Sequence, residues 1–466
     1  MSDSNGGDHA LIAPLAAYAA SLESDQLPDS AIWRLKNSVR DALACGLYGS
    51  SLPWGRMVAD VAHGQAPLDE SVIIWGSDRR AGAFGGALAN GVAVQAYELD
   101  DLHAEASLHG SSTMLPATLA LADLRGGVSG RDLMASLAVG WEVGLRINRC
   151  VGTLLQFGWH PPTIMGTVAA AAAAGRLLKL PAEAMQNCLN LAILQASGLT
   201  VVQYGGMAKR LYAGRAAEIG VQSALLAERG FTTPSQVLEH PFGGFLNTFG
   251  QGRGYEAEAI SDGLGEVHAA NSISFKLYSC CAAIHPAIDL LGDLISDHSD
   301  LSEGNIAHID IYLTDYGLKH VGFSYEPDNA TTAQFSAQYA FAVRLLEGAV
   351  FVDQFRDELL ADPNVLNLIE RIEVHHDPGL DSSDIRARRT ARVEVRLNDG
   401  RLLAAQGFVA SGHPERPASE EDLKAKFSRL AEVVLDRDQS EELAYAVRAL
   451  DEMPDVRSLT DLTRPR

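Results

Sequence analysis

Apolar residues recur at helical spacing through roughly the first 270 positions of this 466-residue chain. These segments are rich in Ala and Leu and poor in β-branched runs, which favours helices over strands. Six consecutive alanines, residues 169–174, would let neighbouring helices approach closely and suit the centre of a tightly packed bundle. Paired glycines and prolines interrupt the pattern where helices should end. The spacing predicts helices over residues 10–22, 31–47, 83–98, 114–124, 130–150, 163–180, 182–197 and 213–229.

The pattern changes near residue 271, where apolar and polar residues begin to alternate with the period of a strand. The segment Asn398-Asp399-Gly400-Arg401 is typical of a hairpin turn. Helical spacing lies between the strands and returns after them, with a capping-box-like start at residues 419–422. The alternation predicts strands at 308–313, 372–375, 391–397 and 402–409, and the helical spacing predicts helices at 283–296, 338–347, 419–434 and 440–450.

Together these patterns predict a protein that is mainly α with an α+β part. A large all-α helical domain would be built from residues 1–270 and 406–466. A smaller α+β lid domain, residues 271–405, would be inserted into it. We expect a site in the cleft between them, because binding sites form preferentially at domain junctions. No glycine-rich phosphate loop follows a strand, so nucleotide binding has no support.

The chain carries 37 basic and 59 acidic residues, a formal net charge of −22. Such a field repels nucleic acid and anionic membranes, so neither is expected as a partner. It also repels anionic substrates, so a site for one must concentrate its own cations. The five cysteines form no CxxC pair and indicate a reduced cytoplasm, not a disulfide framework or structural zinc. Residues 1–9 do not resemble a signal peptide, and no apolar run reaches the roughly 18 residues that span a bilayer. A soluble, cytoplasmic protein is therefore predicted.

Residues 97–110 place four carboxylates and two imidazoles directly after a small, apolar run. Unpaired charges in a low-dielectric interior cost several kcal/mol each, at the order-of-magnitude level. A solvated helix end would explain one such cluster by itself. Three further polar clusters in apolar surroundings instead favour an active site. They contain His160, Lys209, Arg210, Arg215, Lys276 and His285.

Each of these clusters also has a structural interpretation. His160 stands at a predicted helix start, where an imidazole often serves as a cap. No acid accompanies the basic residues between Gly205 and Ala217, which argues against an ordinary charged surface. Cys280 and Cys281 are typical of small buried hydrophobes. Cations and imidazoles on small-residue loops, opposite an acidic cluster, fit a carboxylate-bearing substrate and proton transfer.

The order of these fragments resembles that of the MmgE/PrpD family, which includes 2-methylcitrate dehydratase, cis-aconitate decarboxylase and iminodisuccinate epimerase. The likeness covers nearly the whole chain. Each fragment is weak alone, but their number and order are specific. It rests on Glu98-Leu99-Asp100-Asp101 with His109, Gly158-Trp159-His160-Pro161, residues 209–217, Arg229-Gly230-Phe231-Thr232, residues 276–281 with 285–289, residues 335–340, Gly412-His413-Pro414, and Lys426-Phe427.

The resemblance implies a helical domain with a smaller lid-like α+β domain, a homodimer, and chemistry without a metal or organic cofactor. Two departures bear on the subfamily. Many relatives that decarboxylate or dehydrate carry Thr after the paired aspartates and His-Pro after the acidic loop, where this chain has Leu102 and His109-Gly110. Loss of that hydroxyl weakens the case for a hydroxyl leaving group.

Among family members the chain most resembles iminodisuccinate epimerase, which predicts an isomerase acting on a dicarboxylate or amino-dicarboxylate. A proton next to a carboxylate would leave, and another would return on the opposite face. Lys209 and Lys276 would stabilise the dianionic intermediate, and Asp101 would orient an imidazole. The predicted catalytic residues are Asp101, His109, His160, Lys209 and Tyr339, and the predicted substrate-binding residues are Lys276, Arg210 and His285.

Four alternatives stay open at this point. The first is a lyase for a tricarboxylate, of the 2-methylcitrate dehydratase or cis-aconitate decarboxylase kind. A magnesium-dependent terpenoid synthase would use Asp100-Asp101, although no second acidic motif follows. A mononuclear metal site could combine those aspartates with His103 and His109. A non-enzymatic helical scaffold would need none of these side chains for a ligand.

Overall fold

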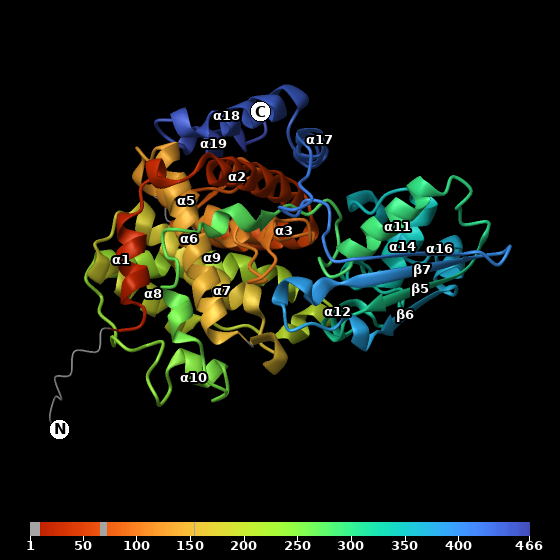
Figure 1. Cartoon of the computed structure of the whole chain (residues 1–466). Helices are drawn as coiled ribbons and strands as arrows, with labels where there is room; N and C mark the ends of the chain where they lie inside the picture. The colour runs from red at the N-terminus through yellow and green to blue at the C-terminus, as the bar shows by residue number, and fades with distance from the viewer. Residues whose placement is uncertain (1–9, 66–71, 153) are drawn as a thin grey trace.

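The computed structural model describes residues 10–65, 72–152 and 154–466. A helical body forms one end of the molecule and a mixed sheet with its own helices forms the other (Figure 1). The predicted class, mainly α with an α+β part, is confirmed. Residues 1–9, in which the sequence predicts no signal peptide, lie outside the described residues. None of the described helices is long and apolar enough to cross a bilayer.

The helical body uses segments from both ends of the chain. Its first helices are α1 (Ala13–Ser21), α2 (Asp29–Ser50), α3 (Pro53–Gly64), α4 (Ala83–Val94), α5 (Ser111–Arg125), α6 (Gly130–Val151), α7 (Pro161–Leu177), α8 (Ala182–Gln195), α9 (Ala208–Glu228) and α10 (Phe245–Phe249). Helices α17 (Glu420–Ala431), α18 (Arg437–Arg448) and α19 (Arg457–Leu462) return to it beside α2 and α5. Two short strand pairs belong to it: β1 (Val72–Ile73) with β2 (Arg80–Ala81), and β3 (Leu102–His103) with β4 (Ile273–Ser274).

Helix α7 lies at the centre of the body, where residues 169–174 are fully buried. Small residues on the neighbouring helices allow close contact. A Cβ on Gly220 of α9 would lie 2.6 Å from the Cβ of Ala170, and one on Gly214 would lie 2.2 Å from the carbonyl oxygen of Leu88 in α4. The backbones of α4, α7 and α9 therefore touch, which is the close packing that the alanine run predicts.

The α+β part is built on a four-stranded sheet in the order β6-β5-β7-β8, with β5 and β6 parallel and the other pairs antiparallel. Gly400, at φ +89°, makes the predicted hairpin turn between the last two strands. The buried side chains of the sheet face α11 and α14. The elements are β5 (Ile306–Leu313), β6 (Ile372–His376), β7 (Ala391–Leu397), β8 (Leu402–Gly407), α11 (His285–Asp297), α12 (Asp315–Val321), α13 (Ala330–Gln334), α14 (Ala337–Glu347), α15 (Asp357–Leu360) and α16 (Pro363–Ile369).

Two helix boundaries differ from the sequence prediction in ways that matter for the site. Helix α4 ends at Val94, four residues before Glu98, because the chain turns there into an acidic loop that we define as residues 95–110. Helix α9 begins at Ala208, so Lys209 and Arg210 lie in its first turn. The predicted small-residue loop at these two cations is thus wrong, and a rigid helix presents them.

Candidate active site

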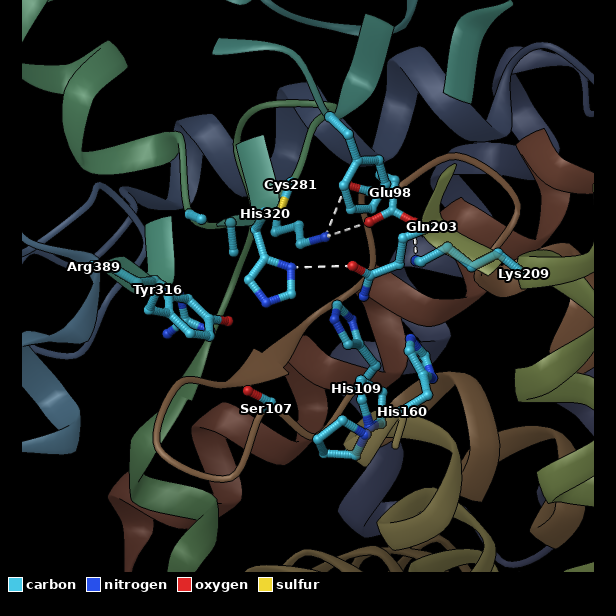
Figure 2. Close-up of a pocket in the computed structure, with 16 residues that line it drawn as sticks. Glu98, Ser107, His109, His160, Gln203, Lys209, Cys281, Tyr316, His320 and Arg389 are labelled. Atoms are coloured by element: carbon cyan, nitrogen blue, oxygen red, sulfur yellow. Dashed lines mark hydrogen bonds and ion pairs between the residues drawn. The ribbon is translucent and has the colours of Figure 1, made fainter. Parts of the chain in front are cut away.

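A narrow cavity of about 60 Å³ lies where the helical body meets the α+β part (Figure 2). The acidic loop, the start of α7, the 3₁₀ helix η3 (Thr200–Tyr204) and α9 line one side. The segment before α11, helix α12 and the 3₁₀ helix η8 (Ile385–Arg389) line the other. Its polar or titratable lining residues are Glu98, Ser107, His109, His160, Gln203, Lys209, Lys276, Cys281, Tyr316, His320 and Arg389.

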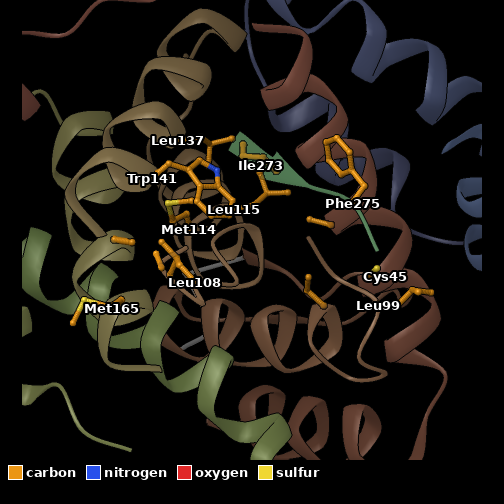
Figure 3. Close-up of a cluster of buried hydrophobic side chains, with 14 of the residues drawn as sticks. Cys45, Leu99, Leu108, Met114, Leu115, Leu137, Trp141, Met165, Ile273 and Phe275 are labelled. Carbon is orange, nitrogen blue, oxygen red and sulfur yellow. The ribbon is translucent and has the colours of Figure 1, made fainter. Parts of the chain in front are cut away.

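The acidic loop is held in place by apolar packing and by a strand pair. Leu99 and Leu108 are both part of the buried apolar cluster, Leu108 at the side of Met114 and Trp141 and Leu99 at the side of Cys45 (Figure 3). Leu102 pairs with Ser274 across β3 and β4, which ties the loop to the segment that carries Lys276. Fixing both segments through their apolar residues leaves the polar side chains free to face the cavity.

Glu98 organises the cations of the site. Its carboxylate forms ion pairs with Lys209 and Arg210, the latter at 2.5 Å, and lies 3.5 Å from the ammonium nitrogen of Lys276. Lys276 also donates to the carbonyl oxygen of Glu98 at 3.1 Å. Burial opposes ionisation of Glu98, but the three cations outweigh it and hold its pKa well below the usual range. The cluster therefore combines one carboxylate with three cations and keeps a positive excess for an anionic ligand.

Two imidazoles face the same cavity with different partners. Nδ1 of His109 lies 3.1 Å from Oδ2 of Asp100. Burial opposes ionisation of Asp100, yet the charge and hydrogen bond of His109 lower its pKa, so this aspartate is ionised and oriented toward the imidazole. Nδ1 of His160 lies 2.6 Å from the hydroxyl oxygen of Thr163. Burial and the nearby Lys209 lower the pKa of His160 well below its usual value, which keeps this ring neutral.

Asp101 lies behind the cavity and does not contact either imidazole in the described hydrogen-bond network. It accepts from the hydroxyl groups of Ser38 and Ser111, the first from α2 and the second from the start of α5. Burial and the charge of Asp41 raise its pKa to about 7, against the lowering effect of the two serines. The aspartate that orients an imidazole is thus Asp100. The prediction that Asp101 has this role is wrong, because its carboxylate binds Ser38 and Ser111 instead.

Three other predicted residues lie at the edge of the cavity or outside it. Arg210 is buried behind Glu98 and also donates to Gln334 at 2.9 Å, so it supports the cluster from the rear. His285 lies on the far side of Lys276, near the carbonyl oxygen of Cys280, in a neighbouring cavity. Tyr339 donates to the carbonyl oxygen of Gln354 at 2.7 Å within the core, so its hydroxyl is already satisfied and does not reach the cavity.

The α+β part contributes residues that the sequence prediction missed. His320 of α12 lies with Nδ1 3.0 Å from Oε1 of Gln203 in η3, a contact drawn across the cavity in Figure 2. Arg389 of η8 lines the cavity and donates to the carbonyl oxygen of Ala104 at 3.1 Å. Arg388 donates to the hydroxyl of Ser107 at 2.5 Å. In the sequence, only the three arginines within residues 386–389 pointed to a contribution from this region. Such a group of arginines is also typical of a surface loop, so the sequence alone did not assign it to the site.

The metal alternatives find little support in these positions. Within the part of the chain that the structure describes, the one set of three or more His, Cys, Asp or Glu ligand atoms that converges is His308, Asp310 and Glu373, far along the sequence from the acidic loop. Asp100 and Asp101 instead have separate partners. The thiol of Cys281, which lines the cavity, has its pKa raised by burial and so stays protonated.

Comparison with known proteins shows the family. Residues 13–258 match the MmgE/PrpD N-terminal domain and residues 278–452 match the MmgE/PrpD C-terminal domain. The chain belongs to the MmgE/PrpD family. Similar curated proteins include the cis-aconitate decarboxylase of Aspergillus terreus, 32% identical over 96% of this chain and 94% of that protein. The cis-aconitate decarboxylase-like protein oryM of Aspergillus oryzae is 32% identical over 97% and 96%, and the human cis-aconitate decarboxylase is 28% identical over 95% and 92%.

These relatives correct the predicted activity. The expected likeness to iminodisuccinate epimerase, and with it the isomerase prediction, is wrong: the similar proteins are named as decarboxylases, which are lyases. That expectation rested on overall similarity, and Leu102 was interpreted as evidence against a hydroxyl leaving group. In the structure Leu102 is buried and lies in the strand pair, and it does not line the cavity. The residue type at this position therefore does not indicate which reaction the site performs.

Proposed function

We propose that this protein is a lyase that decarboxylates cis-aconitate or a closely similar tricarboxylate. The observation that carries the proposal is the cation cluster around Glu98 beside two imidazoles, in a chain similar along nearly its full length to cis-aconitate decarboxylases. A substrate with several carboxylates is complementary in charge to a cavity lined by Lys209, Lys276 and Arg389, in a protein that otherwise repels anions.

The reaction needs charge stabilisation and one proton. When the bond between the methylene carbon and its carboxylate breaks, the electron pair forms a new double bond and carbon dioxide leaves. The electrons of the original double bond move to the carbon beside a second carboxylate, giving an enediolate. Ammonium groups of Lys209 and Lys276 would stabilise that developing charge. One proton then adds to this carbon, and the product is an unsaturated dicarboxylate.

His109 is the proposed proton donor. Its pairing with the ionised Asp100 holds the ring in place, as the aspartate does for histidine in a catalytic triad. His160 is held neutral by its surroundings and would bind a substrate carboxylate through a hydrogen bond. This division gives the two imidazoles separate tasks, set by their different partners.

We also propose that the α+β part acts as a lid, with the domain division near residues 271 and 405 that the sequence predicts. A cavity of about 60 Å³ is small for a tricarboxylate, so entry requires the two sides to separate. The contacts that would open are His320 with Gln203 and the arginines of η8 with the acidic loop. Closure would exclude water from the enediolate.

The proposal is tested by incubating the purified protein with cis-aconitate and measuring carbon dioxide release together with the organic product. We expect stoichiometric carbon dioxide and a five-carbon unsaturated dicarboxylate, by the atom balance of the reaction above. Hydration or dehydration of a tricarboxylate without carbon dioxide would refute a decarboxylase and favour a dehydratase of the same family.

Oligomeric state and cell compartment stay predictions. The family resemblance implies a homodimer, which sedimentation would report as twice the 49.7 kDa chain mass. The five cysteines are all unpaired, in keeping with the reduced cytoplasm that the sequence predicts.

A further inference from the structure

The open face of the sheet carries a polar cluster that the proposed reaction does not use. Strands β5 and β6 are parallel, with Asp310 paired to Glu373 and Tyr312 paired to His375. Because side chains alternate along a strand, His308 and Asp310 lie on the same face as Glu373 and His375, opposite the buried Ile309 and Ile311. Two neighbouring strands thus place two imidazoles and two carboxylates together.

Distances within this cluster suit a bound cation. Nε2 of His308 lies 3.3 Å from Oδ1 of Asp310 and 3.9 Å from Oε1 of Glu373. The ligand atoms of these three residues lie within 4.8 Å of one another. Nε2 of His375 lies 2.8 Å from Asp310 and 3.7 Å from Glu373. Ligands of a tetrahedral zinc ion, at bond lengths near 2.0 Å, are about 3.3 Å apart. The four distances range from 2.8 to 3.9 Å and so include that value.

Neighbouring cations do not compete for these carboxylates. Two arginines of β7 share this face. Arg396 lies opposite His308 in the strand pairing and is exposed. Arg392 pairs with Glu394 and with Asp377 at 2.9 Å, and its guanidinium lies 3.9 Å from the ring centre of Tyr312. In the described part of the chain, the ion pairs of Asp310 and Glu373 are with the two imidazoles alone. Their negative charge is therefore left for another cation.

We propose that His308, Asp310 and Glu373 form a binding site for zinc or a similar first-row divalent ion, with His375 as the fourth ligand after rotation of its half-exposed side chain. Imidazole nitrogen and carboxylate oxygen are both common zinc ligands, and neutral imidazoles with two carboxylates balance the charge of the ion. All four ligand residues lie on the paired strands β5 and β6, which fix their backbones, so little ordering is needed on binding. This inference does not depend on the proposed decarboxylase activity.

The test is calorimetric titration of the full-length, tag-free protein with zinc chloride. The variants His308→Ala and Glu373→Gln remove ligands from an exposed surface and should leave the melting temperature of the metal-free protein unchanged. His376→Ala is the matched control, because this neighbouring histidine points to Asp381, 2.8 Å away, and not to the cluster.

We expect one zinc ion to bind per chain, with affinity reduced by roughly 10- to 100-fold or more in His308→Ala and unchanged in His376→Ala. Zinc should also raise the melting temperature of the wild type and of His376→Ala, but not of His308→Ala. The site is refuted if the wild type binds no zinc, or if His308→Ala binds it as tightly as the wild type does. Equal weakening by both histidine variants would also refute it, since that result indicates nonspecific surface binding.

Discussion

Glu98 determines where the cations of the cavity lie. Its backbone has φ +55°, in the left-handed region that residues other than glycine rarely adopt. Such a conformation persists when the surroundings hold it, and here Lys276 bonds to its carbonyl oxygen while Lys209 and Arg210 bind its carboxylate. The strained residue thus aims two ammonium groups at one place before any substrate arrives.

Replacing Lys209 tests this arrangement. Lys209→Ala should lower kcat/KM for cis-aconitate by about 10²- to 10³-fold, because a preorganised cation opposite the developing enediolate is lost. Lys319→Ala is the control, since Lys319 is exposed and pairs only with its neighbour Asp315 at 2.7 Å in the described structure. Equal rates for Lys209→Ala and wild type, in proteins with the same circular dichroism, would remove Lys209 from the mechanism.

Asp101 predicts a pH dependence of stability. Its pKa is raised to about 7 in the folded protein, against about 3.9 in an unfolded chain. Between about pH 4 and pH 7 the carboxyl group of Asp101 is therefore protonated in the folded protein and ionised in the unfolded chain. The stabilisation is complete below about pH 4 and disappears as the pH rises through 7, a change of the order of a few kcal/mol.

In Asp101→Asn that part of the pH dependence should vanish. Urea denaturation at pH 5 and pH 7.5 would show the wild type losing stability relative to the variant. Parallel changes in the two proteins would mean that this carboxyl titrates alike in the folded and unfolded chains.

Single residues differed in how well the sequence revealed them. Lys209, Lys276, His109 and His160 stood out because charge among small apolar residues is costly unless it has a function. Tyr339 had no such contrast, and burial of its satisfied hydroxyl shows a core role. Two of the residues missed, His320 and Arg389, come from segments more than 100 positions away from the acidic loop, and only the fold brings them to it.

At the scale of elements, most long helices were predicted, although α3 was missed, and the short ones were not. The spacing of apolar residues located α6, α7 and α8 closely, because each completes several turns. Helices α12, α13, α15 and α16, of seven residues or fewer, have too few turns to show a period. The start of α9 was placed too late, since its first turn is polar and follows two glycines.

The close contact between α4 and α9 predicts that the stability of the protein is sensitive to a larger residue at position 214. Gly214→Ala would place a methyl group 2.2 Å from the carbonyl oxygen of Leu88, so the helices must separate. We expect a loss of about 1–3 kcal/mol in the free energy of unfolding and reduced activity, because α9 carries Lys209. Gly64→Ala, where an added Cβ meets nothing within 4 Å, serves as control and should be neutral or slightly stabilising. Equal stability of Gly214→Ala and Gly64→Ala would contradict the close packing.

At the scale of the molecule, the carboxy-terminal helices connect the two sides of the site. Lys426 of α17 pairs with Asp41 of α2 and donates to the carbonyl oxygens of Leu99 at 2.6 Å and Lys276 at 2.9 Å. The acidic loop and the segment before α11 are thus fixed on one side by α17, while the arginines of η8 bind the acidic loop from the α+β part. The sequence predicted that the last helices belong to the helical domain, but it did not predict that Lys426 binds the backbone of Leu99 and Lys276.

A lid predicts protection on ligand binding. A tricarboxylate that bridges Lys209 and Arg389 should raise the melting temperature and slow hydrogen exchange in residues 275–285 and in η8. Arg389→Ala should lose most of the effect on η8, whereas Arg401→Ala, an exposed arginine paired with Asp300 and Asp399, should keep it. Unchanged exchange in both segments at saturating ligand would argue against closure.

The central claim, that these side chains release carbon dioxide and then deliver one proton to carbon, is tested most directly by proton NMR of cis-aconitate incubated with the protein in deuterated water. The account predicts loss of carbon dioxide and one deuterium in the new methylene group of the five-carbon product, with His109→Gln slowed by about 10²- to 10⁴-fold. Deuterium entering the substrate without loss of carbon, or an undiminished rate in His109→Gln, would contradict it.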